Sequence, residues 1–285
     1  MYFYEKLGNI SLIQRIPRIP QDLLFSDSDI VAADIEENLM NYVIRYYHQT
    51  LKASARARRF LADRNILDEK LIQRFQLGFS DRTLGWQFDK LPSWQSASSR
   101  GALQRVGILK PSGHEFFRGA LVFPFFDEQG QIVGAYGRRI TQKLKAYSVY
   151  HVHWTSDGMS FFNIDALKKY KHVLLCKSPL EAMSLLQLGI ENVVSIMGAK
   201  GFSDAHLRVL RIFNTECIGV VFDNDIAHQK IAICIADRLT PLGIQSYKVG
   251  LPKEMDVNRF CMEVSNPKDT FMQYLGSATS MTTLH

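Results

Sequence analysis

The chain has 285 residues, of which 46% are hydrophobic and 22% are charged, a composition typical of a globular protein and not of a disordered one. No apolar run approaches the roughly 20 residues that span a bilayer, and the N-terminus lacks the basic start and apolar stretch of a secretory signal. We therefore expect a cytoplasmic protein with no membrane partner. Lys and Arg outnumber Asp and Glu by 34 to 28, and the resulting net charge of +6 weakly favours a polyanionic partner.

The cysteines do not form a metal-binding pattern. They lie far apart in the sequence and include no Cys-x-x-Cys pair: Cys176, Cys217, Cys234 and Cys261. A free cysteine within an apolar run packs as a small hydrophobic residue. We therefore expect no zinc site.

The first part of the chain predicts a mixed α and β lobe. Residues 1–33 show no apolar period and contain two prolines, so we expect an irregular arm. Apolar residues spaced as on one face of a helix predict an amphipathic helix over 34–51. Two β-rich runs, ALVFPFF and QIVGAYG, are joined by Asp-Glu-Gln-Gly and predict an antiparallel hairpin over 120–137. The lobe is expected to extend from residue 34 to residue 168.

Short apolar runs alternate with helical patterns from residue 173 onward. The expected strands are 173–176, 193–196, 217–222 and 245–249. Strands that alternate with helices of this length predict βαβ units and a parallel sheet covered by helices. We place this domain at residues 169–262 and expect a C-terminal helix and tail over residues 263–285.

Acidic residues follow the ends of these predicted strands. Asp223 and Asp225 come directly after the third strand, and side chains two apart on an extended backbone point the same way. Glu181 follows the first strand and Asp256 follows the last. Because ligands bind at the carboxyl ends of parallel strands, these carboxylates form a candidate Mg²⁺ site for phosphate chemistry. For an isolated Asp-x-Asp pair the alternative is a cap on the next helix.

Several ordered segments resemble the DnaG-type bacterial primases, whose catalytic core contains a TOPRIM domain. RRFLADRNI with EKLIQRFQLGFS, FFRGALVFPFFDEQGQIVGAYGRRI, and SFFNIDAL are similar to successive segments of that core. The order of strand, acidic tip, helix, strand and Asp-x-Asp resembles TOPRIM itself. The resemblance runs from about residue 38 to residue 260. It implies an α/β fold with a TOPRIM-type parallel sheet flanked by helices and preceded by a mixed α+β N-terminal lobe.

The resemblance also implies a set of acidic metal ligands. Asp223 and Asp225 match the metal-holding pair of the family. Glu181 stands where the first acidic motif ends in Asp, and Asp256 lies in the last acidic motif, where Asn258 replaces a second acid. The implied cofactor of an active enzyme is Mg²⁺ or Mn²⁺.

Basic residues match positions that in the family follow the template and the nucleotides. These residues are Arg64, Arg118, Arg138 and Lys145. Lysine and arginine suit phosphate contacts by their charge and their several hydrogen-bond donors. We expect the three arginines to line one groove between the two lobes, next to the acidic rim.

The chain departs from the family pattern at its catalytic tip. Lys177 occupies the position of the family's glutamate, the general acid or base, and Ser178 replaces the adjacent glycine. A charged lysine has no lone pair with which to coordinate Mg²⁺ or accept a proton. One interpretation is a pseudo-site in which Lys177 offsets the carboxylates, and we expect it within its extended reach (~10 Å) of Asp223. The other is a working enzyme in which Lys177 donates a proton to leaving pyrophosphate.

Two smaller departures accompany this exchange. His228 stands where a small glycine is usual and would crowd the phosphates, and Ala120 replaces a second arginine of the basic strand. No cysteine precedes Cys176, so we expect no zinc-binding module, and we expect no helicase-docking domain after the TOPRIM-like part.

The leading interpretation is a DnaG-like primase core that binds single-stranded DNA and joins ribonucleotides into short RNA primers. A mobile element or phage is the expected setting, with a replicative helicase or a mobile-element replication protein as the protein partner. The second interpretation is a catalytically inactive accessory protein that binds nucleic acid. A TOPRIM nuclease or topoisomerase is the third, and the primase-like segments before residue 165 argue against it.

Overall fold

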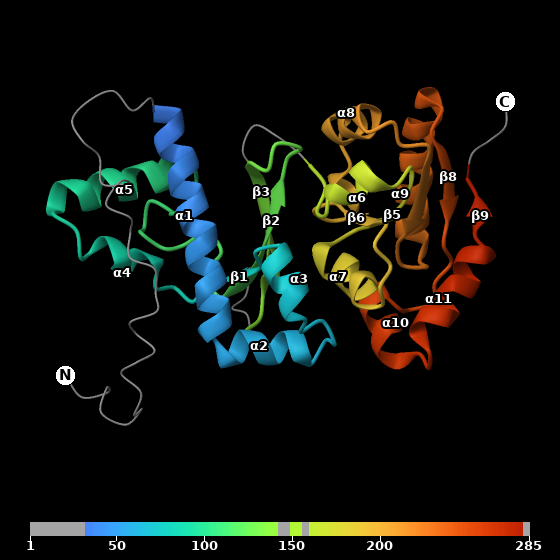
Figure 1. The fold of residues 1–285 in the computed structure, drawn as a ribbon, viewed down its shortest axis with the longest axis horizontal. Helices are drawn as coiled ribbons and strands as arrows, with labels where there is room; N and C mark the ends of the chain where they lie inside the picture. The colour runs from blue at the N-terminus through green and yellow to red at the C-terminus, as the bar shows by residue number, and fades with distance from the viewer. Residues whose placement is uncertain (1–31, 142–148, 156–159, 282–285) are drawn as a thin grey trace. The chain divides into compact units, whose positions relative to one another are not determined.

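The computed structural model describes residues 32–141, 149–155 and 160–281, and the chain forms two compact units. Unit 1 comprises residues up to 58, 76–122 and 137–152, and unit 2 comprises 59–75, 123–136 and 153 onward. Figure 1 labels most of the helices and strands of both. Residues 1–31 of the predicted arm, and Lys145, lie outside the described residues. The predicted linear boundaries after residues 33, 168 and 262 stay a prediction.

The helix predicted over 34–51 is present in unit 1 as α1 (Ala32–Ala53). Its apolar period places Val43, Tyr46 and Tyr47 in the core, where each is at most 1% exposed. The same unit contains β1 (Gly78–Phe79), α4 (Leu84–Phe88) and α5 (Ser93–Arg105). Its core therefore follows from the helical spacing of the sequence.

A buried carboxylate joins three elements of unit 1. Glu115 is 5% exposed and accepts hydrogen bonds from the Tyr47 hydroxyl at 3.0 Å, the Ser80 hydroxyl and the Leu84 amide at 3.0 Å. Burial raises the pKa of Glu115 against the opposing effect of these donors. Such a group is tolerated inside a protein because its acceptors are satisfied.

The hairpin predicted over 120–137 consists of β2 (Ala120–Phe126) and β3 (Ile132–Arg139). The turn forms because one Asp127 carboxylate oxygen accepts from the amides of Gln129 and Gln131, while Gly130 adopts a φ of 86° that favours glycine. Strands β1 and β4 (His151–Thr155) complete a four-stranded sheet in the order β1-β2-β3-β4. The short helices α2 (Ala55–Ala62) and α3 (Glu69–Arg74) precede it in the sequence.

The predicted parallel sheet forms the centre of unit 2 (Figure 1). Its order is β6-β5-β7-β8-β9, with parallel pairing except at β9. The strands are β5 (His172–Cys176), β6 (Val193–Ser195), β7 (Cys217–Val221), β8 (Gln245–Lys248) and β9 (Thr279–Ser280). The helices are α6 (Asp165–Lys169), α7 (Pro179–Gln187), α8 (Asp204–Ile212), α9 (Ile226–Leu239), α10 (Val257–Glu263) and α11 (Pro267–Gly276).

Alternate residues of the central strands explain how helices cover this sheet. Val173 and Leu175 of β5 join Ile218 and Val220 of β7 in one core cluster, to which α8 and α9 also contribute. All residues of β7 are buried, as expected of a parallel strand covered on both faces. The antiparallel edge strand β9 was not predicted, because a two-residue strand carries almost no sequence pattern.

The register of this sheet fixes where the predicted acidic residues emerge. Cys176 pairs with Val221 at the carboxyl ends of β5 and β7. The segments that follow, one beginning at Lys177 and the other reaching Asp223, therefore leave the sheet as neighbours.

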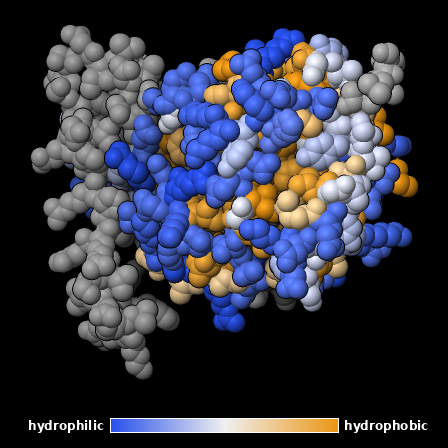
Figure 2. Space-filling model, turned by 45° about the vertical axis from the view of Figure 1, so that its right-hand side comes forward, coloured by the Kyte–Doolittle hydropathy of each residue, from blue (hydrophilic) through white to orange (hydrophobic). Residues whose placement is uncertain are grey.

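Hydrophilic side chains dominate the face of the molecule visible in Figure 2, with hydrophobic residues among them. Exposed apolar residues of unit 2 include Ile212, Ile226 and Ile233, a scatter that is normal for a protein surface. None of the helices in the described part of the chain has both the length and the apolarity needed to cross a membrane.

A buried histidine supports the α8 end of unit 2. The His206 ring is 0% exposed, accepts from the Ser203 amide at 3.1 Å through Nδ1, and lies 3.1 Å from the Ser160 carbonyl through Nε2. This pairing requires the neutral ring, with its hydrogen on Nε2. Burial lowers the pKa of His206 from 6.5 to about 4.

We predict an acid sensitivity of unit 2 that originates at His206. Because its pKa is lower in the folded state, the unfolded chain takes up the proton first; stability is complete above pH 6.5 and falls as the pH drops towards 4. The loss should be about 3 kcal/mol. Urea unfolding between pH 7 and pH 4 measures this loss. The unfolding free energy of His206→Gln should fall less with decreasing pH than that of the wild type, because the glutamine amide offers an acceptor and a donor but does not titrate. Parallel profiles for the two proteins would contradict the prediction.

Candidate functional site at the carboxyl edge of the parallel sheet

The first turn of α7 positions Glu181 at the sheet edge. Ser178 is the N-cap and accepts from the Glu181 amide, and Pro179 occupies the first turn, where proline and a hydroxyl cap are both favoured. The Glu181 carboxylate turns back and accepts from the Lys177 amide at 3.3 Å. Glu181 is a buried residue, so a buried acid lies next to the tip of β5.

Lys177 joins two carboxylates that come from different elements. Its Nζ lies 3.2 Å from Glu181 Oε1 and donates a hydrogen bond to Asp223 Oδ1. The exposed fractions of the three side chains are 19% for Lys177, 4% for Glu181 and 25% for Asp223. The structure thus brings together residues that the sequence predicted to share one rim.

The charges in this cluster keep the lysine cationic. Burial acts to lower the pKa of Lys177, but Glu181 and Asp223 together raise it above its usual value. Burial raises the pKa of Glu181, a shift that Lys177 opposes and that the charges of Asp223 and Asp256 increase. A positive charge here relieves the repulsion between neighbouring carboxylates.

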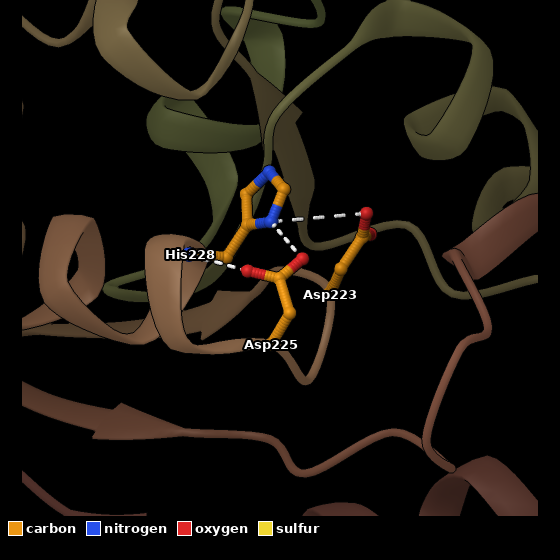
Figure 3. A group of neighbouring side chains, drawn as sticks. All are labelled: Asp223, Asp225 and His228. Atoms are coloured by element: carbon orange, nitrogen blue, oxygen red, sulfur yellow. Dashed lines mark hydrogen bonds and ion pairs between the residues drawn. The ribbon is translucent and has the colours of Figure 1, made fainter.

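Asp225 and His228 form the outer part of the same rim, as Figure 3 shows. Asp225 is the N-cap of α9 and accepts from the His228 amide at 2.8 Å, while its other oxygen lies 2.6 Å from His228 Nδ1. The same ring nitrogen lies 3.9 Å from Asp223 Oδ2. The hydrogen bond from the His228 amide lowers the pKa of Asp225 most, and the contact with the His228 ring lowers it further. Asp225 therefore caps a helix and also faces Asp223.

The described residues contain one group with the composition and spacing of a metal site. Ligand atoms of Asp223, Asp225 and His228 all lie within 4.8 Å of one another. Two carboxylates with an imidazole are suitable ligands for a divalent metal ion. The residues present therefore fit a metal ion at this position, although Lys177 occupies one oxygen of Asp223.

The last acidic motif has a different local role. Asp256 is the N-cap of α10 and accepts from the Arg259 amide at 2.7 Å. Asn258 is 1% exposed and binds Arg64 twice, accepting from its guanidinium at 3.0 Å and donating to its carbonyl at 2.9 Å. Its amide also donates to Ser184 of α7 at 2.9 Å. A second acid at position 258 could not donate these last two bonds.

The predicted basic residues fall in both units. Arg64 belongs to unit 2, and Arg118 and Arg138 belong to unit 1. Arg118 is exposed, while Arg138 lies 3.0 Å from His151 through its guanidinium and stacks 4.8 Å from the centre of the Tyr150 ring. The shared groove stays a prediction.

Two residues of the rim were missed as functional candidates in the sequence. For His228 only the size of the side chain was considered in the sequence. Its position three residues after a helix N-cap aspartate nevertheless indicates an Asp–His pair. Lys248 is the last residue of β8. Its Nζ lies 3.0 Å from the side chain of Asn224, the residue between Asp223 and Asp225 in the sequence. No local pattern marks this lysine, because its proximity to the rim depends on the order of strands in the sheet.

Comparison with known proteins identifies two matching families. Residues 46–149 match the family described as the N-terminal domain of the DNA primase catalytic core, and residues 174–261 match the Toprim-like family. Similar curated proteins are the DNA primases of Clostridium acetobutylicum, 24% identical over 83% of this chain and 40% of that protein, and of Campylobacter jejuni, 25% identical over 80% and 39%. The chain thus spans about 40% of the length of these relatives.

Solved structures of primases have the same fold. A structure of the DnaG catalytic core matches with a TM-score of 0.73 at 21% identity, covering 86% of this chain and 81% of that one. The zinc-binding and RNA polymerase domains of the Aquifex aeolicus primase match with a TM-score of 0.76 at 20% identity, over 90% and 64%. A DnaG primase catalytic domain bound to single-stranded DNA matches with a TM-score of 0.72 at 21% identity, over 88% and 83%. The resemblance and the fold class inferred from the sequence are confirmed.

We predict that Lys177 contributes strongly to the stability of unit 2. Lys177→Met should cost about 3 kcal/mol of unfolding free energy, because it leaves Glu181 and Asp223 without their cation in a partly desolvated rim. The matched control is Lys168→Met, which removes a 2.9 Å pair with Asp165 between exposed side chains and should change stability by less than about 0.5 kcal/mol. Equal effects of the two substitutions in chemical denaturation would contradict the prediction.

Proposed function

We propose, since the chain belongs to the family of DnaG-type primases, that it binds single-stranded DNA as a template and joins ribonucleotides into short RNA primers during DNA replication. The observation that carries the proposal is the meeting of Asp223, Asp225 and Glu181 at the carboxyl edge of the parallel sheet, in a chain that also has the primase N-terminal segments. The likeness to a DnaG domain solved with single-stranded DNA supports the choice of template.

Template binding would depend on the basic residues. Arg64, Arg118, Arg138 and Lys145 would contact phosphates, whose negative charge they match without reading the base sequence. In Arg64 the guanidinium is held by Asn258 and lies 4.9 Å from the centre of the Phe60 ring. A cation fixed by its neighbours loses less side-chain entropy when it binds a phosphate.

Nucleotide chemistry would occur at the acidic rim. Asp223 and Asp225, with Glu181 and Asp256 nearby, would hold Mg²⁺ or Mn²⁺, which when bound neutralises phosphate charge. Lys177 would then serve as the proton donor to leaving pyrophosphate, since its protonated amine has a proton to give and no lone pair with which to act as a base.

A specific observation favours a second candidate function. The pairing of Lys177 with both Glu181 and Asp223 fills the rim with a side-chain cation and leaves fewer oxygens for metal ions. The second candidate is therefore a primase-like protein that binds single-stranded DNA without polymerising ribonucleotides. A replicative helicase or a mobile-element replication protein is the partner that we propose for either function.

We predict that single-stranded DNA binding weakens as salt rises, because neutralised phosphates release counterions. Arg138→Ala should lower the affinity for an oligonucleotide on the order of tenfold and reduce the slope of log K against log salt by about 0.7. Fluorescence anisotropy at several salt concentrations measures both quantities. Arg211→Ala, at an exposed arginine of α8, is the control and should change neither. An Arg138→Ala protein with unchanged affinity and slope would contradict the assignment of Arg138.

A primer assay with labelled ribonucleotides on a single-stranded template tests the proposed function and separates it from the second candidate. RNA products from the wild type that disappear in Asp223→Asn with Asp225→Asn would support primer synthesis at this rim. DNA binding without any product would support the accessory role. A protein that neither binds DNA nor makes primers would contradict both.

A further inference from the structure

We infer that Asp223, Asp225 and His228 form a mixed oxygen and nitrogen site for a single transition-metal ion, with Mn²⁺ bound in preference to Mg²⁺. The inference rests on the proposed function only for the position of the metal at the sheet edge. It concerns what His228, which occupies the place of a small residue, adds to that position.

The imidazole ring lies where a third ligand is needed. In Figure 3 it faces both carboxylates, and its Nδ1 is 2.6 Å from Asp225 Oδ2 and 3.9 Å from Asp223 Oδ2. Adjacent ligand atoms that each lie about 2.1 Å from a shared ion in octahedral geometry, which Mn²⁺ favours, are ~3.0 Å apart. The two distances lie on either side of that value, so small side-chain rotations would make room for an ion. The ion would displace the hydrogen that Nδ1 shares with Asp225.

Neighbouring side chains orient this ring. The amide of His228 donates to Asp225, which sets the start of α9 and the direction of the histidine side chain. The ring also makes an edge-to-face contact with Phe222, with centroids 6.3 Å apart. Its side chain is 23% exposed, so solvent and ions can reach it. A ligand held in place in this way loses little conformational freedom when it binds a metal.

Lys177 determines how much of Asp223 is available to a metal. Its Nζ binds Asp223 Oδ1, while Oδ2 of the same carboxylate faces the His228 ring. The lysine therefore leaves one oxygen for a metal and reduces the negative charge of the rim. Mg²⁺ binds mainly through charge and oxygen ligands and gives up its water reluctantly, so it gains least from this arrangement.

The nitrogen ligand increases the affinity of the rim for transition-metal ions relative to Mg²⁺. Imidazole binds first-row transition-metal ions well, whereas Mg²⁺ prefers oxygen ligands. Mn²⁺ accepts both types and is the probe that separates the two behaviours. The set of two carboxylates and one imidazole, with a lysine beside it, therefore selects a transition-metal ion over Mg²⁺.

The test measures Mn²⁺ binding to the full chain by the loss of the free-ion signal in electron paramagnetic resonance, with Mg²⁺ as competitor and no DNA or nucleotide present. Loss of even an outer-sphere partner of a metal ligand costs about 10- to 100-fold in affinity. We therefore expect His228→Ala to weaken Mn²⁺ binding at least about tenfold and to leave Mg²⁺ binding within about twofold of the wild type. Circular dichroism verifies that α9 is intact.

Matched variants keep the result specific to this histidine. His172→Ala removes an exposed histidine that lies 3.5 Å from a glutamate, Glu216, and should leave Mn²⁺ binding unchanged. His228→Gln keeps a polar side chain near Asp225 and should still lose the Mn²⁺ preference. Wild-type protein that binds Mn²⁺ no better than Mg²⁺, or His228→Ala that binds Mn²⁺ as tightly as the wild type, would overturn the inference. Neither outcome bears on DNA binding or primer synthesis, which the assays above decide separately.

Discussion

Asp223 and Glu181 face one another across the carboxyl ends of two paired strands, and Lys177 lies between them. The strand register brings the ends of β5 and β7 together, so the two acids meet in every folded molecule. One of them is almost fully buried, so water screens the repulsion between them only in part. A lysine whose pKa is raised by these neighbours supplies the missing positive charge within the chain. The stability of this rim depends on that arrangement, and so would the metal binding and catalysis proposed for it.

Two further residues near the rim act in the same direction. Asn258, which by the resemblance stands in place of a second acid, uses its amide to hold Arg64 and Ser184. Lys248 adds a further cation next to Asn224. Both residues lower the net negative charge of the rim, and with it the need for a metal ion to balance that charge. His228 compensates in a different way, because it offers a nitrogen ligand without adding negative charge.

The local part of this organisation follows from the sequence. The predicted strands of the parallel sheet end within about one residue of their observed ends, and for β5, β6 and β7 the reason is that strands buried on both faces carry a continuous apolar signal. The Asp-x-Asp pair was correctly predicted at the carboxyl edge of the sheet, because the direction of the preceding strand alone determines its position. The contacts between distant segments had no such signal. Arg64 and Asn258 are 194 residues apart, and the contribution of residues 59–75 to unit 2 depends on pairs such as Arg74 with Glu191 and Asn163.

The central claim is that Lys177 supplies the positive charge that balances Glu181 and Asp223, so that the free protein needs no Mg²⁺ for its stability. The most direct measurement is thermal unfolding of the wild type and Lys177→Glu, each in EDTA and in excess Mg²⁺. The account predicts that the wild type has the same Tm in both conditions, and that Lys177→Glu melts lower in EDTA and regains about 5 °C or more in Mg²⁺. A wild type stabilised by Mg²⁺ as strongly as Lys177→Glu would contradict the claim.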